Sequence, residues 1–211
     1  MVVPARAVVE TASAGGWTRQ ANLQQQKMKR IRGQRLGVVG VGRIGTAVIL
    51  RAKAFGFALS FYDPGLPAGA EKGLGVARAD SFEELVAGSD AITFHCPYSA
   101  SSRHLPKAGN MPPAGTGLVV VNCARGGLIE EAALIDALAS VAVRGAALDC
   151  LEGEPTPAIE PLLAAQRAGA NLLLTPHSAF YSDEAFTEMR HLAAREVRRV
   201  LLGEPPNYQV N

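Results

Sequence analysis

Short apolar runs recur along the chain from Arg35 onward, separated by stretches with helical spacing and by glycine-rich turns. Most of the runs are near-continuous rather than alternating, which is typical of strands that helices cover on both faces. The pattern predicts six strands, at 35–39, 58–62, 90–96, 117–124, 145–150 and 170–177.

Helical spacing follows several of these strands, at 44–55, 80–88, 129–140 and 182–203. Ser81 with Glu84 has the form of a capping box, and Ser182 is placed as the N-cap of the last helix. Glycines at 56, 88 and 203 come at the expected helix ends.

The alternation of strand and helix predicts an α/β fold with a doubly wound parallel sheet. Two prolines and three glycines in Lys107–Gly117 argue against a regular helix before the fourth strand. We divide the chain into an irregular segment at 1–34, a nucleotide-binding type of domain at 35–180, and a closing helix and tail at 181–211.

Composition narrows the function classes only a little. The chain has 211 residues, 48% of them hydrophobic, and a net charge of +2, which gives no general attraction to nucleic acid or membrane. The basic stretch Lys27–Arg35 is a nuclear address, a polyanion patch or, as we favour, a solvated segment. We expect an intracellular protein, in the nucleus, the cytoplasm or both, because there is no signal-peptide pattern and no apolar run of membrane-spanning length.

The three cysteines, at 96, 123 and 150, form no CxxC pair, so we expect no metal site. A sparse, odd count suits a reducing compartment. The cysteines fall at strand ends and could line a cofactor site, although buried small hydrophobes are the better interpretation. His95, His104 and His191 are interpreted as structural or exposed.

The turn Gly40-Val41-Gly42-Arg43-Ile44-Gly45 fits GxGxxG between a strand and a helix. Gly40 would permit the tight turn, Gly42 the approach of a pyrophosphate, and Gly45 the close packing of helix on strand. Asp63 ends the next strand, where a carboxylate binds ribose hydroxyls and repels a 2′-phosphate. The turn therefore predicts NAD(H) rather than NADP(H); the alternative is a glycine-rich turn without a ligand.

Candidate catalytic side chains follow three later strands. Arg125 could bind a carboxylate through two parallel hydrogen bonds. His177 could deliver a proton near neutral pH, and Glu154 could orient that histidine. Each has an ordinary structural explanation when taken singly. Together they predict a site at the carboxyl edge of the sheet, where open α/β sheets bind ligands.

The segments GVGRIG, NCARGGLIEEAAL, RGAALDCLEGEP and LLLTPHSAFYSDEA resemble the D-isomer-specific 2-hydroxyacid dehydrogenases. Within that family, RAKAFGF, FYDP, RIRG and the last 24 residues look most like the C-terminal-binding proteins, which are NAD(H)-binding transcriptional corepressors. The resemblance covers roughly residues 30–211.

The resemblance implies a role for each matching residue. It makes Arg125 the substrate-carboxylate arginine, His177 the acid/base and Glu154 its partner, and it places Phe180 in the substrate pocket, where a tryptophan is common. Asp149 would lie beside the nicotinamide amide. The implied cofactor-binding set is Gly40, Gly42, Arg43, Ile44, Gly45, Asp63, Cys96, Asn122, Ala124, Arg125, Asp149 and His177.

Two departures from the family bear on function. The family's separate substrate domain, which also holds the corepressors' peptide groove, is expected to be largely absent, and the dimer arm after Ser13 looks shortened. We therefore expect slow or absent turnover of a small 2-hydroxy or 2-keto acid and a weakened homodimer. Transcription factors would bind only if the missing domain is supplied, and neither nucleic acid nor membrane would be a direct partner.

Three functions remain open from the sequence: an NAD-dependent dehydrogenase, a corepressor-type binding protein controlled by NAD(H), and a catalytically weak or inactive NAD-binding fragment.

Overall fold

The computed structural model describes residues 30–207, and it divides the chain into two units, Met1–Pro176 and His177–Asn211. The division falls near the boundary at 180/181 expected from the sequence. The crossover segment and dimer arm expected before residue 30 lie outside the described residues. Among the described residues, no helix has both the length and the apolar character needed to cross a membrane.

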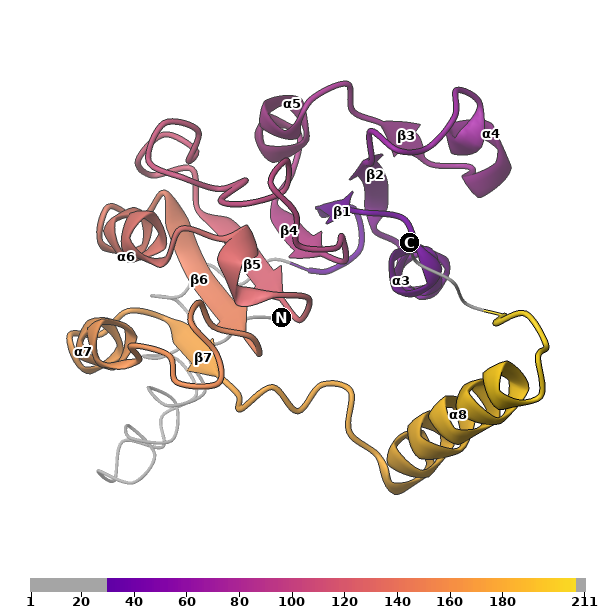
Figure 1. Ribbon diagram of the computed structural model, residues 1–211. Helices are drawn as coiled ribbons and strands as arrows, with labels where there is room; N and C mark the ends of the chain where they lie inside the picture. Colours follow the sequence, from indigo (N-terminus) through magenta and orange to yellow (C-terminus); the bar gives the residue numbers. More distant parts are fainter. Residues whose placement is uncertain (1–29, 208–211) are drawn as a thin grey trace. The chain divides into compact units, whose positions relative to one another are not determined.

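The first unit is built on a seven-stranded sheet in which every pair of neighbouring strands is parallel (Figure 1). The strand order is β3-β2-β1-β4-β5-β6-β7. The strands are β1 (Arg35–Val39), β2 (Ala58–Tyr62), β3 (Ala77–Arg78), β4 (Ala91–Phe94), β5 (Leu118–Asn122), β6 (Val143–Leu148) and β7 (Leu172–Leu174). The doubly wound parallel sheet expected from the sequence is therefore confirmed.

Helices connect the strands. They are α3 (Arg43–Ala54), α4 (Ala70–Leu74), α5 (Phe82–Ala87), α6 (Glu131–Ala139) and α7 (Glu160–Arg167), with a 3-10 turn η1 (Gly126–Leu128) before α6. The Ser81 hydroxyl accepts a hydrogen bond from the Glu84 N–H, as the capping box predicts. Gly56 follows α3 with φ +77°, a left-handed conformation that suits glycine.

The core lies on both faces of the sheet. Val38 and Phe61 pack with Ile49 of α3 on one face, whereas the next residue, Val39, belongs to the larger cluster that includes side chains of α5, α6 and α7. Successive strand residues point to opposite faces, so a strand covered on both sides needs an apolar residue at every position. This requirement explains the near-continuous apolar runs.

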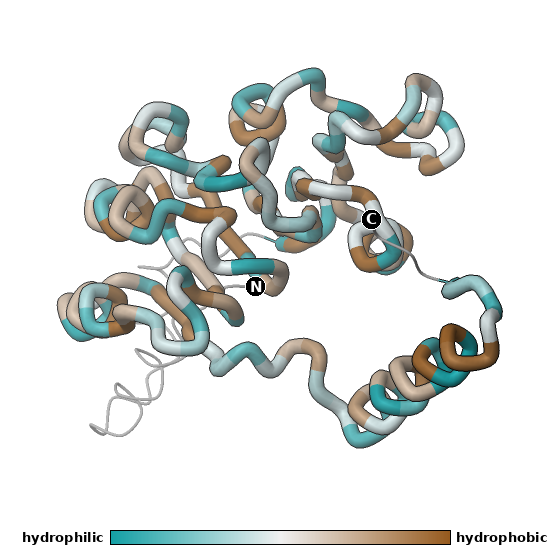
Figure 2. Tube along the Cα trace, viewed as in Figure 1, coloured by the Kyte–Doolittle hydropathy of each residue, from teal (hydrophilic) through white to brown (hydrophobic). Residues whose placement is uncertain are grey.

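The second unit carries α8 (Asp183–Leu201), whose N-cap Ser182 accepts a hydrogen bond from the Ala185 N–H. Its polar and apolar side chains are segregated, and Figure 2 shows hydrophobic residues gathered toward its C-terminal end. Gly203 has φ +73° just beyond the helix, as the sequence predicted.

The sequence missed α4, β3, η1 and α7, and predicted six strands instead of seven. The strands expected at 90–96, 117–124 and 170–177 are also shorter than predicted. The residues that follow Phe94, Asn122 and Leu174 leave the sheet and form the loops described next. Lys107–Gly117 contains no helix, as expected.

Candidate cofactor and active site

The sheet order changes direction beside β1, which lies between β2 and β4. Strands β2 and β3 extend to one side of β1, and β4 to β7 extend to the other. Because all strands are parallel, their carboxyl ends meet at one edge of the sheet. A ligand crevice forms at such a switch point in open α/β sheets.

The glycine turn occupies this position, directly after β1. Gly40 has φ +86°, and a Cβ there would lie 2.6 Å from the backbone of Cys96. A Cβ on Gly45 would lie 2.1 Å from the Gly40 carbonyl oxygen. Gly42 differs, since a Cβ there would meet nothing within 4 Å. Two glycines thus allow close packing within the protein, and the third leaves space above the turn.

The N-terminus of α3 begins at this open glycine. Gly42 is the N-cap and has no side chain with which to cap the helix. The first turn, Arg43 to Thr46, carries no acidic residue. The positive end of the helix dipole is thus not offset by a carboxylate of its own first turn, which favours a phosphate at this point. The described residues therefore fit the pyrophosphate of a dinucleotide.

Asp63 is held in a fixed orientation at the end of β2. Its Oδ2 accepts a hydrogen bond from the Val41 N–H (2.8 Å), and its Oδ1 accepts one from the Gly65 N–H (3.0 Å). The carboxylate is therefore tied directly to the glycine turn. It lines a hollow of about 680 Å³ together with Tyr62, Pro64, Ala68, Glu71, Arg78, Ala79 and Asp80.

Arg125 is exposed on the turn after β5, and Asn122 shapes that turn. The buried Asn122 amide donates to the Arg125 carbonyl (2.9 Å) and accepts from the Ala124 N–H (3.0 Å). A Cβ on Gly126 would lie 1.9 Å from the carbonyl carbon of Leu151. The arginine turn therefore packs directly on the backbone that follows β6, and only glycine fits at the contact.

Asp149 is buried at the end of β6 and accepts a hydrogen bond from the Thr175 hydroxyl (2.5 Å). The Thr175 N–H also donates to the Leu148 carbonyl (3.0 Å). The chain thus leaves β7 fixed beside Asp149. His177 is the second residue after Thr175, so covalent geometry limits its Cα to about 7 Å from that of Thr175.

Within the second unit, His177 has φ +50°, and its ring meets the ring of Phe180 edge to face, with the centroids 6.1 Å apart. The Phe180 side chain is exposed. A phenylalanine three residues after the histidine thus contacts its ring directly.

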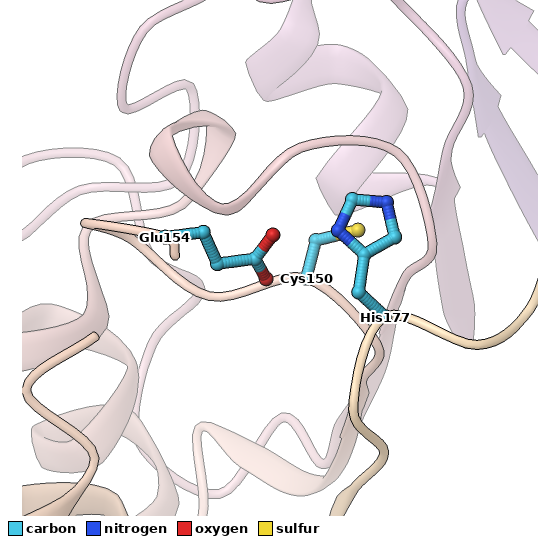
Figure 3. A group of neighbouring side chains, drawn as sticks. All are labelled: Cys150, Glu154 and His177. Atoms are coloured by element: carbon cyan, nitrogen blue, oxygen red, sulfur yellow. The ribbon is translucent and has the colours of Figure 1, made fainter. Parts of the chain in front are cut away.

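Glu154 lies on the turn after β6, and its Oε1 accepts a hydrogen bond from the Leu151 N–H (2.7 Å). Its carboxylate is within 4.8 Å of the Cys150 thiol. Figure 3 draws these two side chains with His177, which begins the segment after Pro176. Burial, with the nearby carboxylates of Glu154 and Asp149, raises the pKa of Cys150 to about 11. The thiol is therefore neutral at physiological pH when no metal is bound.

The pKa values of the other two cysteines at this edge are also raised. Burial raises the pKa of Cys96 to about 11, and Asp63 contributes to the shift. Burial likewise raises the pKa of Cys123. Cys96 is half-buried, and its backbone lies 2.6 Å from the position that a Cβ on Gly40 would take.

Sequence reasoning missed several side chains of this region. The Tyr98 ring covers Gly127, where a Cβ would lie 2.6 Å from ring carbon Cε2. His104 is interpreted from the sequence as structural or exposed. Its ring Nε2 lies 2.9 Å from Glu152 Oε1, and its backbone N–H donates to the Gly127 carbonyl. Burial raises the pKa of Glu131, which accepts a hydrogen bond from the Glu152 N–H. None of these contacts has a local sequence signal.

The sequence profile of the NAD-binding domain of D-isomer-specific 2-hydroxyacid dehydrogenases matches residues 4–179. The chain belongs to this family. The fold is a Rossmann-type NAD-binding domain, and the glycine turn with Asp63 provides the features that such a domain uses for the cofactor.

Two curated relatives show how the chain compares with characterised members. It is 36% identical over 214 residues to the D-3-phosphoglycerate dehydrogenase of Methanocaldococcus jannaschii, covering 100% of this chain and 39% of the relative. It is 37% identical over 181 residues to C-terminal-binding protein 1 of Caenorhabditis elegans, covering 84% of this chain and 24% of the relative.

Solved structures give the same fold. A D-lactate dehydrogenase of Treponema pallidum has a TM-score of 0.82 and 30% identity, covering 98% of this chain and 63% of that one. An acyclic imino acid reductase in complex with NADPH and D-Arg has a TM-score of 0.78 and 27% identity, covering 97% of this chain and 62% of that one. The chain thus spans less than two thirds of each of these relatives.

Proposed function

We propose that this chain is the cofactor-binding half of an NAD(H)-dependent oxidoreductase that interconverts a small 2-hydroxy acid and the matching 2-keto acid. The observation that carries the proposal is the grouping of Arg125, Asp149 and Glu154 after neighbouring strands β5 and β6. His177 is tied covalently to the adjacent strand β7.

Each residue is proposed to have a role that suits its chemistry. The glycine turn and the N-terminus of α3 hold the pyrophosphate, and Asp63 holds a ribose. Arg125 binds the substrate carboxylate as a bidentate fork. The bound nicotinamide supplies or accepts the hydride.

His177 donates a proton to the keto oxygen during reduction and removes it from the hydroxyl during oxidation. Glu154 is its proposed hydrogen-bond partner and would orient the imidazole. The place of His177 in the sequence, two residues after Thr175, supports this role, because the covalent chain keeps the histidine Cα within about 7 Å of the Thr175 Cα, which directly follows β7.

The test is a steady-state assay of NADH oxidation with a series of 2-keto acids. The proposal predicts a rate, even if slow, that is lost in His177→Ala and kept in His191→Ala, which alters an exposed histidine of α8. Arg125→Lys is expected to raise KM more than it lowers kcat, because it removes the fork. Equal rates in the two histidine variants would contradict the catalytic assignment.

A second candidate function is a corepressor-type binding protein whose assembly responds to NAD(H). The extended similarity to C-terminal-binding protein 1 favours it. Light scattering over a concentration series, with and without NADH, tests this candidate. It predicts NADH-dependent self-association without substrate turnover, and a mass that is independent of NADH would count against it.

A further inference from the structure

The hollow beside Asp63 is lined by more negative charge than ribose binding requires. Asp63, Glu71 and Asp80 contribute three carboxylates, and Arg78 is the one basic side chain among the lining residues. The carboxylates come from three separate segments: the end of β2, the helix α4 and the residue after Ala79.

The Arg78 guanidinium donates hydrogen bonds to backbone carbonyls of the protein itself. Its Nη1 donates to the Pro67 carbonyl, and its Nη2 donates to the carbonyls of Asp63 and Leu66, each at 3.1 Å. Its guanidinium also lies 5.9 Å from the centroid of the Phe61 ring. Arginines that accept a 2′-phosphate present their donors to the ligand. Arg78 instead fixes the loop that follows β2.

Glu71 is fixed in the wall of the hollow. It is half-buried, and its Oε2 accepts a hydrogen bond from the Gly69 N–H (3.1 Å). Gly69 has φ +94°, so the turn that brings Glu71 to the hollow suits glycine. Asp80 is exposed, and its N–H donates to Glu84 Oε2, which anchors its backbone to α5.

We infer that Glu71 and Asp80 are specificity-determining residues that, together with Asp63, exclude a dinucleotide carrying a 2′-phosphate. The inference rests on the proposed placement of the cofactor ribose at Asp63. A 2′-phosphate would enter a hollow whose lining carries three negative charges against one positive charge. Removing Asp63 alone therefore leaves two carboxylates that still repel NADPH.

The test measures the dissociation constants of NADH and NADPH by nicotinamide fluorescence, for the wild type, Asp63→Asn, Glu71→Gln and the double variant. Glu71→Gln keeps an oxygen that can accept from Gly69 and removes only the charge. It is expected to lower the NADPH/NADH ratio of dissociation constants about fivefold, the factor that Coulomb repulsion gives for a dianion roughly 8 Å from one carboxylate in water. Asp80→Asn acts in the same direction.

Asp136→Asn is the matched control, since it removes an exposed carboxylate from α6 that does not line the hollow. Its ratio is expected to equal the wild-type ratio. In 1 M salt the wild-type ratio is expected to fall, and the effect of Glu71→Gln to shrink, because screening weakens the repulsion.

The inference is overturned if Glu71→Gln weakens or strengthens both cofactors equally, or if the ratio is insensitive to salt. A wild-type chain that binds NADPH as well as NADH would overturn the inference and leave dinucleotide binding intact. A chain that binds neither would instead refute the proposed function.

Discussion

Gly42 and Gly45 lie three residues apart in one turn, yet the structure predicts opposite consequences for replacing them with alanine. A Cβ at Gly42 would enter open space, at φ −75°, which alanine adopts freely. A Cβ at Gly45 would lie 2.1 Å from the Gly40 carbonyl oxygen. The first substitution therefore tests the ligand site, and the second tests the packing of helix on strand.

Gly45→Ala forces α3 and the turn apart by about 1 Å, and overpacking of this kind costs about 1–3 kcal/mol. Gly42→Ala changes only the N-cap residue, so the free energy of unfolding should fall by about 1 kcal/mol at most. The methyl group does, however, occupy the space over which a pyrophosphate approaches the backbone. Losing one charge-assisted hydrogen bond, about 1.5–3 kcal/mol, weakens NADH binding about 10- to 150-fold.

Urea unfolding followed by circular dichroism, combined with NADH fluorescence titration, measures both quantities for each variant. The expected result is a stable Gly42→Ala protein that binds NADH poorly and a Gly45→Ala protein that is less stable. If Gly42→Ala bound NADH as tightly as the wild type, the pyrophosphate would not approach the backbone at Gly42, and its placement on this turn would be wrong.

Two further predictions concern stability. Phe61 of β2 is fully buried and packs with Ile49 of α3. Phe61→Ala should therefore lower the free energy of unfolding, measured in urea, by about 3–5 kcal/mol. A loss below about 1 kcal/mol would contradict the described core. Burial raises the pKa values of Cys96 and Cys150 to about 11, above the ordinary thiol value of 9.0. Between pH 9 and pH 11 these two thiols therefore lose their protons in the unfolded chain but keep them in the folded chain. The free energy of unfolding should therefore fall as pH rises from about 9 to 11, and a Cys96→Ala/Cys150→Ala variant should show a shallower fall; an unchanged slope would refute this cause.

Much of the sheet could be predicted because a strand covered on both faces needs apolar residues at nearly every position. β1 and β2 are covered on both faces, and their continuous apolar runs gave the observed bounds of both. β3 has two residues and α4 has five, too few to establish a period, so both were missed. α7 has eight residues and was also missed, although Pro161 in its first turn is a helix-start signal that could have indicated it.

The residues of the candidate site also fall into two groups, those that a local sequence pattern marks and those that it does not. Asp63 and Arg125 could be found because each directly follows a strand or lies in a turn with recognisable glycines. Glu71, Arg78 and Tyr98 could not, because their relation to the site comes from contacts that the folded chain makes and that follow no sequence period. Arg78 in particular is identified by the three carbonyl groups to which it donates, and no local pattern marks them.

Calorimetric titration of the purified chain with NADH is the most direct test of the dinucleotide site, because it needs neither substrate nor turnover. We expect a saturable heat of binding with one site per chain and a weaker interaction with NADPH under the same conditions. Absence of saturable binding at millimolar NADH, by a chain whose circular dichroism shows that it is folded, would contradict the claim that the glycine turn and Asp63 form a dinucleotide site.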